Sequence, residues 1–199
     1  MSYPKITVNT SLALPLIAAD SIPIPYPGCQ QLKGNNTANT ADKLVDLNAD
    51  FSNVVVHDIV YNTATGTIAT VTAVDSSTVL SLTADIFQNS PNDTYIVFQG
   101  GPVFEKRIDS SSGCLLYVGS NASIVQDIQA TSPADPGVGT ADPRYVDVCV
   151  DTVEGTIQKP NTVTFKNFKV GEYLPVQVRK LRVDGTSSSI RNQACIAIW

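Results

Sequence analysis

Histidine and glutamate are scarce in this chain of 199 residues, which holds one histidine, His57, and three glutamates against 15 aspartates. A single histidine disfavours general acid–base catalysis. The sequence has neither a nucleophile elbow nor a third group that would complete a catalytic arrangement with His57 and Asp58. No glycine-rich loop opens a helix to hold nucleotide phosphates, and no paired carboxylates suit glycoside hydrolysis. We therefore expect a protein that is not an enzyme and uses no cofactor.

Long apolar runs are also missing. No stretch reaches the ~18 apolar residues that a membrane span needs. The first residues, Met-Ser-Tyr-Pro-Lys, show no basic and then apolar signal peptide. These features predict no membrane association and synthesis in a reducing cytoplasm.

Charge is unevenly distributed along the chain. Residues 1–158 hold 6 basic and 16 acidic residues (net −10), whereas residues 159–199 hold 7 basic and 2 acidic residues (net +5), which sums to the net charge of −5. A basic tail can bind nucleic acid, but aromatic residues for base stacking are sparse in it. We therefore predict a solvated face or a surface for an acidic partner, and disfavour nucleic acid.

The four cysteines, Cys29, Cys114, Cys149 and Cys195, lack the close spacing of a zinc or redox motif. They could form two disulfides in three connectivities, but buried thiols that act as small hydrophobes fit better.

One segment has part of a calcium-loop pattern. Asp46–Asp50 reads D-x-N-x-D, but Phe51 stands where the loop needs glycine and His57 where it needs glutamate. This excludes an EF-hand and leaves only an adventitious cation site as an alternative.

The residues that are abundant favour strands. Valine, isoleucine and threonine number 23, 15 and 19, or 57 β-branched residues in all. We predict an all-β protein with an N-terminal arm and linker (residues 1–43), a small β-barrel-like module (44–100) and a C-terminal β-sandwich module of jelly-roll type (101–199). Gly100-Gly101-Pro102 marks the boundary between the modules.

Strand patterns between turn signals locate the expected elements. The predicted strands are Val54–Asn62, Gly66–Val74, Thr78–Leu82, Tyr95–Phe98, Leu115–Gly119, Ile124–Gln129, Tyr145–Val150, Thr162–Phe165, Tyr173–Val183 and Ala194–Trp199. Val146, Val148 and Val150 should share one buried face. A change of apolar register predicts a bulge near Arg179–Lys180. We also expect a short helical turn near residues 84–88 and a long loop at 130–143.

Residues 1–28 should form an extended arm, because proline at every second position from Pro23 to Pro27 excludes a stable helix. Such an arm lies on its own domain or on a neighbouring subunit. Residues 29–43 are polar and read as a linker or surface loop. We predict subunit contacts from the apolar side chains of the arm and from a basic C-terminal face: Ile6, Val8, Leu12, Leu14, Ile22, Ile24, Tyr26, Arg179, Lys180 and Arg182.

Two stretches carry short motifs between turn signals. The first comprises Leu115–Gly119, Thr162–Phe165, Val170–Val178, Asp184–Thr186 and Ile196–Trp199, and the second comprises Asp46, Ala49–Phe51, Asp58, Val60, Asn62, Ala69–Ser76 and Asp85–Phe87. Both stretches resemble structural proteins of tailed phages. The half from Leu115 onward is similar to the head-spike-base type of virion protein in phages and gene transfer agents, which has a "LYVG" strand and a "VTF…V..G..LPV.V" ending. Residues 44–98 resemble segments of structural proteins from marine and cyanobacterial phages.

This resemblance implies a non-enzymatic virion protein, made in the host cytoplasm and placed on the particle surface. It would be a capsid decoration (cement) or head-spike-base subunit, with the major capsid protein and further copies of itself as partners. Alternatives are a tail or baseplate adaptor, a fibre-attachment protein or a host-surface carbohydrate-binding module. A single tryptophan argues against the last of these.

Overall fold

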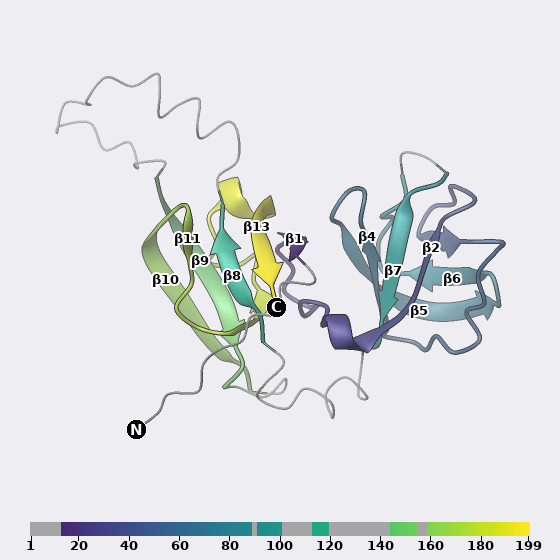
Figure 1. Cartoon of the computed structure of the whole chain (residues 1–199), viewed down its shortest axis with the longest axis horizontal. Helices are drawn as coiled ribbons and strands as arrows, with labels where there is room; N and C mark the ends of the chain where they lie inside the picture. Colours follow the sequence, from purple (N-terminus) through teal and green to yellow (C-terminus); the bar gives the residue numbers. More distant parts are fainter. Residues whose placement is uncertain (1–12, 89–90, 101–112, 120–143, 155–158) are drawn as a thin grey trace, which may run out of the picture.

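The computed structural model of the chain describes residues 13–88, 91–100, 113–119, 144–154 and 159–199 (Figure 1). Their regular structure is almost all strand, and the helical segments among them are two short 3-10 turns. The predicted all-β fold is confirmed. The elements are β1 (Ala13–Ile17), η1 (Pro27–Cys29), β2 (Gln30–Asn35), β3 (Lys43–Val45), β4 (Ile59–Asn62), β5 (Ile68–Ser76), β6 (Val79–Leu82), β7 (Thr94–Phe98), β8 (Leu115–Val118), β9 (Tyr145–Thr152), β10 (Asn161–Lys169), β11 (Glu172–Tyr173), β12 (Val178–Leu181), η2 (Ser188–Ile190) and β13 (Asn192–Ile198).

Strands β2 to β7 form one antiparallel six-stranded sheet in the order β2-β7-β4-β5-β6-β3. The register between β5 and β6 shifts twice, and such bulges bend a sheet. The sheet is therefore curled (Figure 1). The core that it surrounds contains Phe51, Phe87 and Tyr95. We call this part of the molecule the N-terminal lobe.

Two sheets make up the remainder, which we call the C-terminal lobe. A four-stranded sheet has the order β1-β13-β8-β11, and a three-stranded sheet has the order β10-β9-β12. They enclose a common core to which Leu116, Val148 and Ala197 contribute. This core continues into the N-terminal lobe through Ile59 and Phe98, so the two lobes share buried apolar contacts.

The predicted extended arm of residues 1–28 contains the first described strand, β1. β1 pairs antiparallel with β13, at the opposite end of the sequence, and Leu14 and Leu16 are only 3% and 2% exposed. Pro15 is accommodated because β1 lies at a sheet edge, where a missing N–H costs no ladder bond. The sequence allows the arm to lie on its own domain or on a neighbouring subunit. Residues 13–17 lie on their own domain.

The sequence predicts a linker or surface loop for the polar interval 29–43, and this is wrong for its first part. Gln30–Asn35 is β2, an edge strand paired with β7. This polar strand is stable because it lies at a sheet edge, where half of its side chains stay exposed to water.

Some of the other local predictions are confirmed, and some are wrong. Val146, Val148 and Val150 are all buried in one core, and the register shift between Val178 and Lys180 is the predicted bulge. The predicted helical turn at 84–88 is wrong, because that segment has no helical hydrogen bonding. The expected strand Tyr173–Val183 is divided into β11 and β12, which lie in different sheets. The interval 124–129 and the loop 130–143 lie outside the described residues.

Asp58 fastens three segments of the N-terminal lobe and is fully buried. Its carboxylate accepts bonds from Gln31 Nε2 at 2.7 Å, Val55 N at 2.9 Å and Gly100 N at 2.8 Å. These contacts join β2, the loop before β4 and the end of β7.

Substitution of Asp58 by alanine should therefore lower the free energy of unfolding by roughly 2–3 kcal/mol, because it leaves buried donors without an acceptor. The matched control is Asp50→Ala in the same region, whose exposed carboxylate accepts from the backbone N–H and the side chain of Ser52. Its effect should stay within about 0.5 kcal/mol. Urea unfolding measures both values, and equal effects would contradict this role of Asp58.

Candidate functional site

The apolar residues predicted as subunit contacts are used largely within the chain. Leu14 and Ile24 are buried, and Ile22 packs against the same core while partly exposed. Tyr26 is partly exposed before η1. Ile6, Val8 and Leu12 lie outside the described residues.

The three basic residues predicted as contacts also meet groups of their own chain. Arg182 donates from Nε and Nη2 to the two Asp151 carboxylate oxygens, at 2.7 and 2.8 Å. Lys180 lies 3.7 Å from the same carboxylate and donates to the Asp20 carbonyl at 3.1 Å. Arg179 donates to the Val153 carbonyl at 3.0 Å. The positive charge of this segment is therefore partly neutralised inside the lobe.

Asp151 is the centre of this network and is 3% exposed. Burial alone would raise the pKa of its carboxyl group, but the hydrogen bonds from Arg182 and from Thr162 Oγ1 (2.6 Å), with the nearby positive charges, outweigh burial. The pKa is therefore below its usual range. The carboxylate is a structural anion that holds β9, β10 and the end of β12 together.

An apolar row crosses the outward face of the four-stranded sheet. Tyr173 on β11 lies opposite Tyr117 on β8, which lies opposite Ile196 on β13, which lies opposite Pro15 on β1. Directly opposed residues in an antiparallel sheet project from the same face. The two tyrosine rings touch, with centroids 5.2 Å apart, and Tyr173 is 54% exposed.

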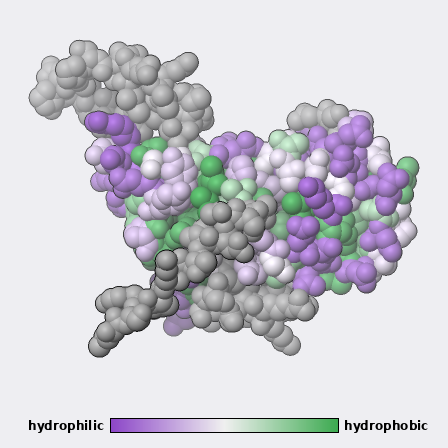
Figure 2. Space-filling view, viewed as in Figure 1, coloured by the Kyte–Doolittle hydropathy of each residue, from purple (hydrophilic) through white to green (hydrophobic). Residues whose placement is uncertain are grey.

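A second row lies beside the first on this face. Leu115, Ile198 and Ala13 oppose one another on β8, β13 and β1, and each retains some exposure. Figure 2 shows hydrophobic residues gathered at the surface over β8 and β13. We call the surface of these seven side chains the apolar sheet face.

Contiguous apolar surface of this kind marks interaction sites more often than chance. The opposite side of the same strands carries the buried core residues Leu14, Leu116 and Ala197. The sheet is therefore apolar on both sides, whereas an antiparallel sheet with one solvated face normally alternates with polar residues. The apolar sheet face is the strongest candidate contact surface in the described chain. Sequence reasoning missed it, although unbroken apolar strands such as Leu115–Val118 were a signal.

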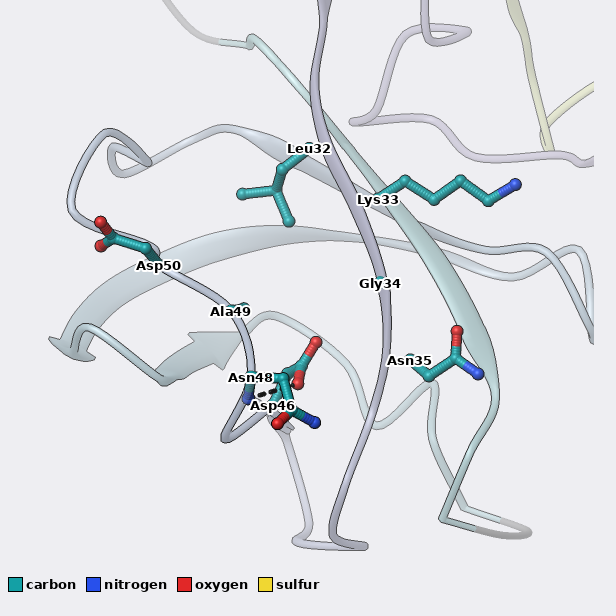
Figure 3. A pocket seen from close by; sticks show the side chains of 8 residues that line it. All are labelled: Leu32, Lys33, Gly34, Asn35, Asp46, Asn48, Ala49 and Asp50. Atoms are coloured by element: carbon teal, nitrogen blue, oxygen red, sulfur yellow. Dashed lines mark hydrogen bonds between the residues drawn. The ribbon is translucent and has the colours of Figure 1, made fainter.

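The calcium-like segment borders a shallow hollow of about 380 Å³ next to β2. Asp46 uses one carboxylate oxygen to accept from Asn48 N at 2.9 Å and the other to accept from Tyr95 Oη at 2.7 Å. Figure 3 shows Asp50 well separated from Asp46 and Asn48. The two Asp46 carboxylate oxygens thus accept hydrogen bonds from the turn and from the core tyrosine. The acidic residue at the start of this segment therefore has a structural role. In the described ranges, no group of three or more histidine, cysteine, aspartate or glutamate side chains could hold a metal ion.

His57 is exposed and occupies a left-handed backbone conformation (φ 76°), with its N–H donating to the Val71 carbonyl at 2.8 Å. A β-carbon at Gly100 would lie 2.1 Å from the His57 carbonyl oxygen, so this turn requires glycine opposite it. The described contacts of His57 are therefore those of a residue in a tight turn.

None of the four cysteines forms a disulfide, and all four are buried, as predicted. Burial raises the pKa of the Cys114 and Cys195 thiols to about 12.

We expect a thiol reagent at pH 8 to label almost none of the four cysteines while the protein is folded, and all four after unfolding in urea. The thiolate is the reactive form, and both burial and the raised pKa suppress it. A colorimetric thiol assay measures the difference. Rapid labelling of the native protein would contradict the burial.

The helices in the described part of the chain are too short to cross a membrane. No protein-family model, curated protein or solved structure matches this chain.

Proposed function

We propose that the chain is a non-enzymatic structural subunit of a tailed-phage particle. It is a capsid decoration (cement) or head-spike-base subunit that bridges major capsid protein subunits. The observation that carries the proposal is the apolar sheet face, an aromatic and aliphatic surface spread across four strands. The resemblance of Leu115–Trp199 to virion proteins supports the same reading.

The aromatic side chains of the apolar sheet face suit it to contact with another protein. Tyrosine provides a large, stiff contact with a polar end, and it is enriched where protein surfaces bind one another. Tyr117 and Tyr173 stand side by side near the centre and edge of the sheet, so a coat subunit docked here would bury both rings together. Bridging of two coat subunits by one rigid sheet adds stability to a shell without any chemical step.

The test compares two double variants of the labelled protein for binding to heads that lack it. Tyr117→Ser/Tyr173→Ser removes the aromatic pair. Val55→Ser/Val56→Ser is the control, since these valines are 51% and 43% exposed on the N-terminal lobe. We expect the tyrosine variant to bind about tenfold or more weakly and the valine variant to bind as the unmodified protein does. Co-sedimentation with heads measures both.

Urea unfolding midpoints close to the unmodified value establish that each variant is folded. Equal binding by the two variants would overturn the role of the apolar sheet face. Binding to isolated tails but not to heads would overturn the head assignment and favour the tail adaptor.

A further inference from the structure

The apolar sheet face contains no acidic or basic side chain. Five of its seven side chains are aliphatic, and the other two are the tyrosines of β8 and β11. The two phenol hydroxyl groups are therefore the only side-chain polar groups among these seven residues. A surface of this composition offers a partner apolar contact and a few hydrogen bonds, but no opposite charge.

The charged side chains on or directly beside the four strands of this sheet are Glu172 and Arg191. Glu172 opposes the core residue Val118, so it projects from the other side of the sheet. Its carboxylate lies 3.3 Å from Lys169 Nζ. Arg191 precedes β13, and its Nε donates to the Thr186 carbonyl at 2.8 Å. Neither residue supplies a charge to the apolar sheet face.

Basic residues that were predicted as contacts lie on the other sheet of the C-terminal lobe. Lys180 is on β12 and Arg182 follows that strand, whereas the apolar sheet face is formed by β1, β13, β8 and β11. Both side chains lie against the Asp151 carboxylate, and they are only 17% and 23% exposed. Their positive charge is therefore balanced inside the lobe and is a weak source of attraction at the apolar sheet face.

We propose that the apolar sheet face docks onto an uncharged apolar patch of the coat subunit, without a contribution from charge. A charged group of the partner would lose its water against this face and meet no opposite charge, which is costly. An apolar group of the partner gains free energy by the same loss of water. The uncharged face thus matches an uncharged partner, just as a positive patch matches a negative one. This inference rests on the proposed function, which names the coat subunit as the partner.

The first measurement needs no variant. Labelled protein is co-sedimented with heads that lack it in about 50 mM and about 500 mM sodium chloride, because salt in this range screens charge attraction strongly. We expect the dissociation constant to change by less than about twofold. Weakening by about tenfold or more at the higher salt concentration would show that charge contributes, and it would overturn the proposal.

The second measurement introduces a charge of either sign at Tyr117. This residue lies between Tyr173 and Ile196 in the apolar row, so a docked partner would cover it. Tyr117→Lys and Tyr117→Asp are compared with Tyr117→Ser, which removes the ring without adding a charge. We expect both charged variants to bind at least about fivefold more weakly than the serine variant. A charged partner patch would favour one of the two signs, so tighter binding of either charged variant than of the serine variant would overturn the proposal.

Val55→Lys and Val55→Asp are the controls, because Val55 is 51% exposed on the N-terminal lobe. Both should bind as the unmodified protein does, and urea unfolding midpoints establish that every variant is folded. If the unmodified protein binds no heads at either salt concentration, the proposed function fails and this proposal fails with it. If it binds heads but weakens strongly with salt or favours one sign at Tyr117, the proposed function stands and only the uncharged partner patch is overturned.

Discussion

Replacement of both Leu14 and Leu16 by alanine is expected to unfold the C-terminal lobe. These side chains are almost fully buried in the core shared by both sheets of that lobe. Each buried leucine truncated to alanine costs about 2–5 kcal/mol. Two such losses approach the entire stability of an ordinary domain, about 5–15 kcal/mol.

The chain carries a convenient reporter for this experiment. Its single tryptophan, Trp199, follows β13 directly and packs against the same core. Urea unfolding followed by Trp199 fluorescence therefore reads the lobe that β1 completes. Pro15→Ala is the matched control, because Pro15 lies between the two leucines and faces outward. It should shift the midpoint little. A double variant with the unmodified midpoint would show that β1 is not part of the sheet.

The Asp151→Asn variant should lose roughly 2–3 kcal/mol of stability at pH 7, and the loss should disappear in acid. The carboxylate accepts two bonds from Arg182 and one from Thr162 Oγ1, and asparagine cannot replace all of these contacts. Charge-assisted bonds of this geometry are among the stronger ones in proteins.

The direction of the pH effect follows from the lowered pKa. In the unfolded chain an aspartate titrates near 3.9, and in the folded protein the Asp151 carboxyl holds its proton less tightly. The stabilisation is therefore complete above about pH 4 and is lost as the pH falls through the folded value. Unfolding of the unmodified protein should show an acid limb that Asp151→Asn lacks.

Asp147→Asn serves as the control for this comparison. The salt bridge to Lys166 also lowers the pKa of Asp147, but the lysine is largely exposed to water. Exposed pairs contribute little to stability. If the two variants gave equal losses at pH 7, the buried network would not have the role assigned to it.

The sequence predicts elements whose partners are local or whose patterns are strict. Alternation in Tyr145–Val150 places one apolar face correctly, and the break in register after Val178 locates a real bulge. In contrast, β1 is stabilised by a strand nearly the whole chain away, which no local pattern records. Pro15 within β1 also predicts a break in the strand, because its position at the sheet edge cannot be known from the local sequence.

The apolar sheet face was not predicted from the sequence. Subunit contacts were predicted for the apolar side chains of the arm, but Leu14 and Ile24 are buried within their own chain. The apolar sheet face depends on register across four strands, which brings Tyr117 and Tyr173 together from positions 56 residues apart. Apolar residues occupy both alternating positions of β8, and this pattern predicts a strand that is buried on both sides. The sequence pattern therefore does not reveal that one side of β8 faces outward.

Strand β1 and the apolar sheet face belong to the same sheet. Pro15 and Ala13 contribute to that face, while Leu14 and Leu16 anchor it from beneath. This surface therefore combines residues from opposite ends of the chain, those of β1 and those of β13.

The copy number of the chain in purified particles tests the proposed function most directly. Quantitative mass spectrometry against the major capsid protein measures it, and gold-tagged antibody then locates the copies. We expect hundreds of copies for a decoration role, or a fixed smaller set at head positions for a spike base, with gold on the head. A few copies with gold confined to the tail, or no detectable chain in the particles, would contradict it.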